Sequence, residues 1–330
     1  MRRIAWPINR DMRDAIGNAF GYVAAGTALS ETVARLGVEI DDDAPTEVHF
    51  VNPMGLRPRP GRFVVLFTMF EHAELPEYFD RGFLRADLAI VPSRYCRSIF
   101  TPLSRKTGTP LDLVPLGFDP ARFPFHPRSM PRAGDPFTFL HVGAPNGRKG
   151  IVPVIRAWDR YFGGCKDVHL FVKTTTPGDA RLERVSHNVT FDSRRYTDAE
   201  MTDLYHRAHC LVWPTGGEGF GLPALEAMAT GLPIITVKHS SHPEFLQDAA
   251  YYARHTMTWT TDGFKHWIRG ADVHIDDLAL RMIEVRERYP VALAKAARGA
   301  LRAHKSWTWD HAARRLVDVL DRHVPDSMWG

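Results

Sequence analysis

Short apolar runs alternate with segments of helical periodicity along most of this chain of 330 residues. Apolar runs bounded by turn residues indicate buried strands, and apolar positions spaced three or four apart indicate helices. Their alternation predicts an α/β protein built on parallel sheets. Strands are expected at 2–6, 47–52, 62–68, 137–142, 168–173, 189–191, 209–213 and 232–237. Helices are expected at 21–36, 151–162, 198–208, 222–229, 291–304 and 306–323.

The stretch Pro214–Val237 has the most informative pattern. It follows the apolar run 209–213, and its glycines allow the backbone to bend and to approach a ligand closely. These glycines are Gly216, Gly217, Gly219 and Gly221. A helix opened by Leu222-Pro223 follows, because proline is tolerated in a first helical turn. A strand, a glycine loop and a helix in this order place unpaired N–H groups at the carboxyl edge of a sheet, which is a site for a diphosphate.

Two acids make this stretch more specific. Glu218 lies in the glycine loop, and Glu226 lies inside the helix that follows. An acid beside a phosphate site repels the phosphate unless it binds something else, and sugar hydroxyls donate charge-assisted hydrogen bonds to carboxylates. The arrangement therefore suits a nucleotide-sugar, with the diphosphate on backbone amides, one acid on the ribose and the other on the transferred sugar.

The segment Glu218-Gly-Phe-Gly-Leu-Pro-Ala-Leu-Glu226 resembles the E-x7-E signature of retaining glycosyltransferases of family 4, which have the GT-B fold. The resemblance implies that Glu226 holds the ribose hydroxyls and that Glu218 holds a hydroxyl of the donor sugar. It also implies that backbone amides hold the sugar and the diphosphate, at Gly219, Phe220, Gly221 and Leu222. The loop also fits the dinucleotide fingerprint G-x-G-x-x-A, but Lys238 stands where a Rossmann dehydrogenase needs an acid.

The GT-B resemblance also implies an overall architecture. It consists of two Rossmann-like, doubly wound domains with an interdomain cleft, and a C-terminal helix that crosses back to the first domain. Val114-Pro-Leu-Gly-Phe-Asp119 resembles the family's exit from that domain, and the proline-rich stretch 123–136 has the composition of a semi-rigid hinge. We therefore expect an acceptor-side domain at 1–124, joined by a helix at about 308–330, and a nucleotide-sugar-binding domain at 125–307.

A second glycine loop, Gly143–Gly150, follows the strand at 137–142. Arg148 and Lys149 stand in it where two cations would clamp a diphosphate and stabilise the leaving group. Gly143 and Lys149 keep the family spacing, but Ala144 occupies the position of the usual arginine, so Arg148 is the candidate replacement. Lys173, at the end of the next strand, is a further candidate donor contact.

The first domain contributes three candidate residues. Gly17 precedes the N-terminus of the helix at 21–36, and the resemblance implies that this loop approaches the donor phosphate and the acceptor. Glu71 and His72 follow the strand at 62–68. We expect both side chains to project toward the cleft and to orient the acceptor or the sugar.

Composition constrains the setting of this chemistry. The formal charge is +4, and hydrophobic and charged contents of 44% and 24% are those of an ordinary globular protein. No apolar run approaches a membrane span, and the N-terminus lacks the apolar region of a signal peptide. The cysteines Cys96, Cys165 and Cys210 form no C-x-x-C pair, which indicates a reducing compartment. These features predict a cytoplasmic protein.

Neither of two possible metal motifs has the right context. The acids at 41–43 are typical of a surface turn, and His239 and His242 have no third ligand at the usual spacing. We therefore predict no metal and no cofactor beyond the nucleotide-sugar co-substrate.

The sequence predicts an enzyme, a metal-independent retaining glycosyltransferase that moves a sugar from a nucleotide-diphosphate sugar to a hydroxyl acceptor. The acceptor is a glycan, a lipid-linked or a small molecule. One alternative is a phage-type glycosyltransferase of hydroxymethylated bases in DNA, with Arg57, Arg59 and Arg62 on a phosphate backbone. Another is a nucleotide-sugar-binding protein without turnover, suggested by Ala144.

Overall fold

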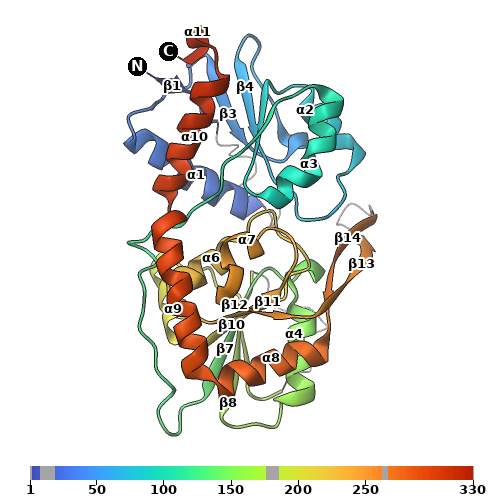
Figure 1. Ribbon diagram of the computed structural model, residues 1–330, viewed down its shortest axis with the longest axis vertical. Helices are drawn as coiled ribbons and strands as arrows, with labels where there is room; N and C mark the ends of the chain where they lie inside the picture. The colour runs from blue at the N-terminus through green and yellow to red at the C-terminus, as the bar shows by residue number, and fades with distance from the viewer. Residues whose placement is uncertain (1, 8–18, 176–185, 262–266, 330) are drawn as a thin grey trace. The chain divides into compact units, whose positions relative to one another are not determined.

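The computed structural model describes residues 2–7, 19–175, 186–261 and 267–329. The chain forms two compact units: unit 1 is Met1–Gly117 with Trp307–Gly330, and unit 2 is Phe118–Ser306 (Figure 1). The sequence-based boundary between residues 124 and 125 falls a few residues later. The difference arises because the proline-rich stretch is bonded to unit 2, where the His126 amide donates to the Thr230 carbonyl at 3.1 Å.

Unit 1 is built on a four-stranded parallel sheet in the order β3–β4–β5–β6. β4 and β5 are almost entirely buried, so they are continuous apolar runs and show no alternation. A pair of short strands extends the sheet, because Ala5 bridges in parallel to Glu47 of β3. The strands are β1 Arg3–Ile4, β2 Glu39–Ile40, β3 Thr46–Phe50, β4 Phe63–Phe67, β5 Leu88–Val91 and β6 Leu111–Leu113.

The helices of unit 1 come from both ends of the chain. They are α1 Ala19–Arg35, α2 Asp80–Phe83, α3 Arg94–Thr107, α10 Trp309–His323 and α11 Asp326–Trp329, with 3-10 turns η2 Pro53–Gly55 and η3 Glu77–Phe79. α10 packs against α1. Gly117 lies close to the start of α10, because a Cβ added to it would be 2.4 Å from the Thr308 carbonyl carbon. The predicted C-terminal helix that packs on the first domain is thus confirmed.

Unit 2 contains a six-stranded parallel sheet in the order β12–β11–β10–β7–β8–β9. The strands are β7 Phe137–Val142, β8 Val168–Lys173, β9 Val189–Asp192, β10 Cys210–Val212, β11 Ile234–Val237 and β12 Ala250–Ala253. The chain adds strands outward from β7 on one side and outward from β10 on the other. In sheets of this doubly wound type, the crevice at the carboxyl ends of the two central strands is where ligands bind.

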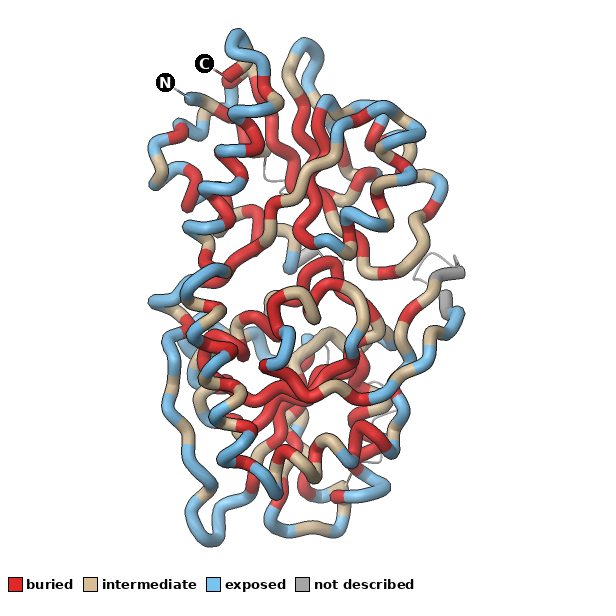
Figure 2. The backbone as a smooth tube through the Cα atoms, viewed as in Figure 1, coloured by how far each residue is buried: buried red, intermediate tan, exposed pale blue. Residues whose placement is uncertain are grey.

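The helices of unit 2 pack around this sheet, α4 against α8 and α6 against α9. They are α4 Ile151–Tyr161, α5 Asp198–Arg207, α6 Leu222–Ala229, α7 Pro243–Leu246, α8 Ile275–Glu287 and α9 Tyr289–Ser306, with η4 Gly147–Lys149 and η6 Gln247–Ala249. Figure 2 shows the strands as buried and the outward sides of the helices as exposed. Fully buried Phe139, Trp158 and Tyr289 belong to one apolar core. Among the described helices of both units, none is long and apolar enough to cross a bilayer.

The sequence pattern missed one element of unit 2, an antiparallel hairpin formed by β13 His255–Thr261 and β14 Trp267–Val273. Trp259 pairs with Arg269 across the hairpin and is 57% exposed. The described residues of the hairpin range from exposed to buried, and its strands lack the apolar runs by which the other strands were found. The last helix, predicted from residue 306, begins at Trp309, because α9 continues through Ser306.

Candidate active site

The two predicted glycine loops lie side by side in unit 2, because they follow the adjacent strands β7 and β10. Gly150 has a left-handed φ of +79°, and a Cβ there would lie 2.4 Å from the Pro214 carbonyl oxygen. The Gly216 amide donates to the Arg148 carbonyl at 2.7 Å. Glycine at these positions therefore allows the two loops to approach each other closely.

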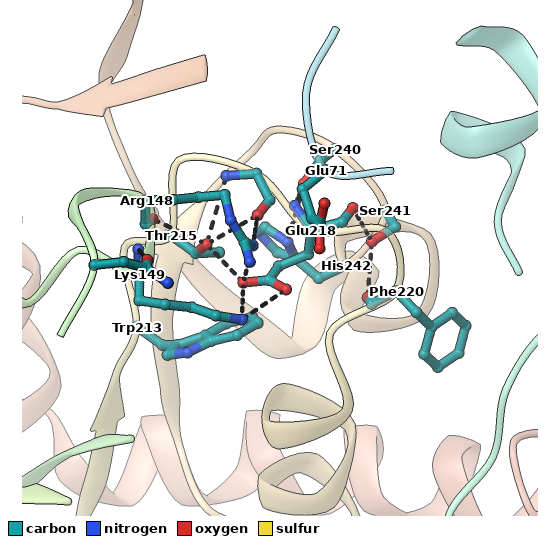
Figure 3. A network of polar contacts seen from close by, with 12 residues as sticks. Glu71, Arg148, Lys149, Trp213, Thr215, Glu218, Phe220, Ser240, Ser241 and His242 are labelled. Carbon is teal, nitrogen blue, oxygen red and sulfur yellow. Dashed lines mark hydrogen bonds and ion pairs between the residues drawn. The ribbon is translucent and has the colours of Figure 1, made fainter. Parts of the chain in front are cut away.

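Glu218 forms the centre of the polar cluster between these loops (Figure 3). Lys149 Nζ lies 2.8 Å from its Oε1 and 3.0 Å from its Oε2, and Arg148 Nη1 lies 3.0 Å from Oε1. The Thr215 hydroxyl donates to Oε1 at 2.8 Å. Only 8% of the Glu218 side chain is exposed, compared with 13% and 17% for Arg148 and Lys149. The structure thus places one acid and two cations in a site that is nearly closed to water.

Electrostatics keep Glu218 ionised despite its burial. Burial by itself raises the pKa of this carboxyl, but Lys149 and Arg148, with the hydrogen bonds from Lys149 and Thr215, lower it to about 2. An attraction of this kind is stronger in a buried site than in water, because the effective dielectric constant is lower. Glu218 is therefore a carboxylate at neutral pH.

The sequence-based prediction gave Glu218 to a sugar hydroxyl and Lys149 and Arg148 to the diphosphate. In the structure these three side chains bind one another. Both cations carry more N–H donors than one carboxylate uses, since an ammonium has three and a guanidinium five. Gly143 assists this arrangement, because a Cβ there would lie 3.1 Å from Lys149 Cβ.

Two histidines and a tryptophan lie close to the cluster, and none of the three was among the predicted site residues. The Trp213 indole donates to the Val142 carbonyl at 3.0 Å, and Lys149 Nζ is 5.8 Å from the Trp213 ring centre. His141 and His242 are fully buried, and burial lowers the pKa of each to about 4. Both imidazoles are therefore neutral at pH 7, so the charges of this cluster are those of Glu218, Lys149 and Arg148.

A serine pair after β11 holds the loop that carries Glu218. The Glu218 amide donates to Ser240 Oγ at 2.9 Å, and Ser241 Oγ lies 2.8 Å from the carbonyl oxygens of both Glu218 and Phe220. Ser240 has a left-handed φ of 60°, which is strained for a residue other than glycine. No local signal indicated that these serine hydroxyls bond to the other loop.

The second acid lies in a different environment. Glu226 is half-buried in α6, and the Tyr205 hydroxyl donates to its Oε2 at 3.0 Å. Burial raises the pKa of Glu226 to about 7, although Tyr205 and the charge of Arg122 oppose the shift. Glu226 is therefore about half ionised near neutral pH.

The glycine loop ends where α6 begins, as predicted. Gly221 precedes Leu222, the first residue of α6, with φ +102°, and a Cβ at Gly221 would lie 3.2 Å from the Trp213 ring. Phe220 is buried and its ring packs against Phe245 at 5.4 Å. Gly219 is buried beside it. The N-terminus of α6 thus follows Glu218 closely along the chain.

Lys173 is less available than the sequence suggested. It lies at the end of β8, where its Nζ donates to the carbonyls of Thr174 and Arg194 at 2.8 and 2.7 Å. The same Nζ lies 4.6 Å from the Tyr196 ring centre. These contacts use two of its three donors, so a donor contact by Lys173 stays a prediction.

The remaining candidates belong to unit 1 or lie outside the described residues. Glu71 and His72 follow β4, and the Tyr95 hydroxyl donates to the Glu71 carbonyl at 3.3 Å. The buried His72 ring packs edge-on against Phe70 at 5.6 Å. Gly17 lies outside the described residues. In the described part of the chain, no group of three or more His, Cys, Asp or Glu side chains is placed to hold a metal ion.

Comparisons with known proteins find glycosyltransferases. Residues 136–261 match a family model described as glycosyl transferases group 1. A segment is 30% identical over 122 residues to the serotype-specific mannosyltransferase WbdA of Escherichia coli, covering 35% of this chain and 15% of that protein. A putative glycosyltransferase of a Sulfolobus islandicus filamentous virus is 22% identical over 265 residues, covering 74% of this chain and 73% of that protein.

Solved structures resemble nearly the whole chain. Sucrose-phosphate synthase from Thermosynechococcus elongatus superposes with a TM-score of 0.73 at 16% identity, covering 98% of this chain and 99% of that chain. WaaG, a glycosyltransferase involved in lipopolysaccharide biosynthesis, gives a TM-score of 0.61 at 16% identity, covering 96% and 99%. These likenesses confirm the predicted GT-B fold, and the family match supports the prediction of a transferase enzyme. Residues 136–261 thus resemble the glycosyl transferases group 1 family, within a chain that has the GT-B fold.

Proposed function

We propose that this protein is a retaining glycosyltransferase of family 4 that transfers a sugar from a nucleotide-diphosphate sugar to a hydroxyl group. One observation carries the proposal, the buried cluster of Glu218, Lys149 and Arg148 at the carboxyl ends of β7 and β10. Glu226 follows in α6, with the Tyr205 hydroxyl on one of its two carboxylate oxygens. The matches to glycosyltransferases support the same reaction class.

In this proposal the cations bind the diphosphate and stabilise the charge that develops on it. Lys149 and Arg148 are already held by Glu218, so they are pre-organised and need little rearrangement when the donor arrives. Backbone amides from Gly219 to Leu222 add hydrogen bonds to the sugar and the diphosphate. Glu226 accepts hydrogen bonds from the ribose hydroxyls. Glu218 accepts a hydrogen bond from a hydroxyl of the sugar.

The chemical step needs no protein nucleophile. The bond between the anomeric carbon and the diphosphate oxygen breaks, and the acceptor oxygen bonds to the same face of that carbon. The acceptor proton passes to the departing diphosphate, so the anomeric configuration is kept. Positioning and charge stabilisation are then the protein's contribution. Glu71 and His72 are proposed to orient the acceptor or the sugar.

The decisive experiment uses a panel of nucleotide-sugars, UDP-glucose, GDP-mannose and ADP-glucose among them, screened for thermal stabilisation and then for release of the nucleoside diphosphate. We expect one donor to stabilise the protein. Lys149→Met is expected to lower its turnover by about 100-fold or more, because a preorganised cation at the leaving group is lost. Lys166→Met, at an exposed position of the same unit, is the matched control.

Two results would contradict the proposal. Equal turnover by Lys149→Met and Lys166→Met would exclude the diphosphate role of Lys149. A product with inverted anomeric configuration, seen by NMR, would exclude the retaining mechanism.

The DNA-modifying alternative gains no support from unit 1. Arg59 binds buried Glu47, and Arg62 donates to the carbonyls of Asp43 and Ala44. Arg57 donates to the carbonyls of Met54 and Leu56. These contacts hold the arginines against their own loop, against β3 and against the turn before β3. Binding to hydroxymethylated DNA that weakens steeply with salt would nevertheless favour that alternative.

A further inference from the structure

We propose that Tyr205 is a positioning residue for the donor: its hydroxyl holds one oxygen of Glu226 and leaves the other oxygen to accept the ribose hydroxyls. This inference rests on the proposed function and deepens it. Tyr205 lies near the end of α5, in a different element from Glu226, and its hydroxyl donates to Glu226 Oε2 at 3.0 Å. Tyr205 is fully buried and Glu226 is half-buried, so the tyrosine approaches the carboxylate from the interior side.

Arg128 fixes the distance between the two helices that carry this pair. Its side chain is partly buried, and its guanidinium donates to the carbonyl of Tyr205 at 2.8 Å. The same group donates to the Thr230 hydroxyl at 3.2 Å and to the Thr230 carbonyl, just after the end of α6. The ends of α5 and α6 are therefore tied through one rigid, planar group. The Phe123 ring packs edge-on against Tyr205 at 6.0 Å and restricts its rotation.

The direction of this hydrogen bond determines which oxygen meets the donor. Burial, followed by the nearby charge of Glu226, raises the pKa of Tyr205 well above its ordinary value, so its hydroxyl keeps its proton and donates. When Glu226 is protonated, its own proton must lie on the oxygen that Tyr205 does not occupy. That oxygen then carries a hydrogen and is a weaker acceptor for the ribose hydroxyls than an ionised carboxylate oxygen. Ionised Glu226 should therefore bind the ribose more tightly than protonated Glu226.

The groups that act on Glu226 come from α5 and from the stretch before β7. Burial raises the pKa of Glu226 to about 7, Tyr205 and Arg122 lower it, and Asp198 raises it. Arg122 and Asp198 form an ion pair with each other, which weakens the effect of both. On α9, His304 bonds to the Ala229 carbonyl at the end of α6. Donor affinity should therefore decrease as pH drops below about 7. Loss of the tyrosine hydroxyl should raise the pKa of Glu226 and so shift the midpoint of this decrease to higher pH.

The test is Tyr205→Phe, with Tyr289→Phe as a matched control. Tyr289 is also fully buried, and its hydroxyl donates to the His209 carbonyl at 3.1 Å, so both variants lose one buried hydrogen bond. The affinity for the nucleotide-sugar that binds the wild type, from UDP-glucose, GDP-mannose and ADP-glucose, is titrated between pH 5.5 and pH 8.5. For Tyr205→Phe we expect about tenfold weaker binding at pH 7, because the carboxylate loses a charge-assisted hydrogen bond.

Further readouts separate positioning from a structural role. Tyr205→Phe should raise KM for the donor and leave kcat within about twofold of the wild-type value. This is because the contact of Glu226 with the ribose is equally strong in the ground state and in the transition state. The midpoint of the affinity profile should move to higher pH, whereas Tyr289→Phe should lower thermal stability and leave that midpoint in place. In a Glu226→Gln background, which has no ionisable group at this position, Tyr205→Phe should no longer change the pH dependence.

Each outcome decides the inference. If Tyr205→Phe and Tyr289→Phe give the same profile, or if Tyr205→Phe shifts the profile equally in the Glu226→Gln background, Tyr205 has no positioning role and the proposed function still stands. If the wild type binds none of the nucleotide-sugars, the proposed function fails and the role of Tyr205 fails with it. A shift of the profile confined to Tyr205→Phe would establish the inference.

Discussion

At the residue scale, the two acids of the E-x7-E segment ionise differently, although burial acts in the same direction on both. Burial raises the pKa of each, but Lys149 and Arg148 lower that of Glu218 to about 2, whereas Glu226 stays near 7. Environments that separate the pKa values of two carboxyl groups in this way are typical of sites in which the two groups have different roles. Glu218 is a permanent charge here, and Glu226 gains its full charge only above neutral pH.

The Glu218 cluster should stabilise the fold in a pH-dependent manner. The folded-state pKa of about 2 lies below the ordinary value of 4.5, so the contribution is complete above pH 4.5 and is lost as pH falls toward 2. Glu218→Gln is therefore expected to lower the free energy of unfolding by about 3 kcal/mol at pH 7. The deficit should shrink as pH falls, as measured by urea unfolding between pH 7 and pH 3.

Glu287→Gln, at an exposed position in α8, is the matched control and should change the free energy of unfolding little at any pH. A deficit for Glu218→Gln that is the same at pH 7 and pH 3 would show that the ion pairs with Lys149 and Arg148 do not stabilise the protein.

At the element scale, the site depends on how closely two loops and a hairpin approach one another. Gly150 lies against Pro214, and Gly216 donates to Arg148. On its other side, the Gly216 carbonyl accepts from the Ala271 amide of β14 at 2.8 Å. The glycine loop is thus held between the β7 loop and the hairpin, which fixes the position of Glu218 relative to Lys149.

Gly150→Ala should disturb this contact much more than Gly147→Ala in the same loop. Gly150 has φ +79° and its added Cβ would be 2.4 Å from a backbone oxygen, whereas a Cβ at Gly147 would meet nothing within 4 Å. Backbone strain alone is expected to cost about 1–3 kcal/mol at Gly150, and the clash adds to it. Urea unfolding of both variants measures the difference, and equal stabilities would mean that the loops do not need this close approach.

At the scale of the whole molecule, each unit has its own apolar core, and the last helix belongs to the first unit. Unit 2 packs its core around Trp158, Phe139 and Tyr289, and unit 1 packs a separate one around Phe79 and Phe100. α10 packs against α1, although the two are separated by most of the sequence. The stability of unit 1 therefore depends on the last residues of the chain.

Leu316→Ala in α10 should destabilise unit 1 selectively. Leu316 is fully buried, so its truncation is expected to cost about 2–5 kcal/mol. Hydrogen exchange should accelerate at the amides of β3–β5 and of α1, and should change little in β7–β12. Leu301→Ala, at a position 74% exposed in α9, is the control. Equal acceleration in both units after Leu316→Ala would contradict the assignment of α10 to unit 1.

Much of this architecture could be predicted from local pattern. Apolar runs located β4, β7, β8 and β11 closely, and glycine positions located both loops and the start of α6. The hairpin β13–β14 was missed because its strands carry no continuous apolar run. The polar roles of Ser241 and Tyr205 were missed for another reason. Serine and tyrosine at those positions are compatible with many environments, and only the packed structure supplies their partners.

The sequence by itself determined what depends on neighbouring residues: the strands, the glycines that permit sharp bends, and the spacing of Glu218 and Glu226 along one loop and helix. The tertiary structure alone decided which distant groups meet these acids. Lys149 reaches Glu218 because strand order places β7 beside β10, and Tyr205 reaches Glu226 because the fold of unit 2 brings the two side chains together from α5 and α6. Ionisation follows from those neighbours and from burial, so the different behaviour of the two carboxyl groups is a property of the fold.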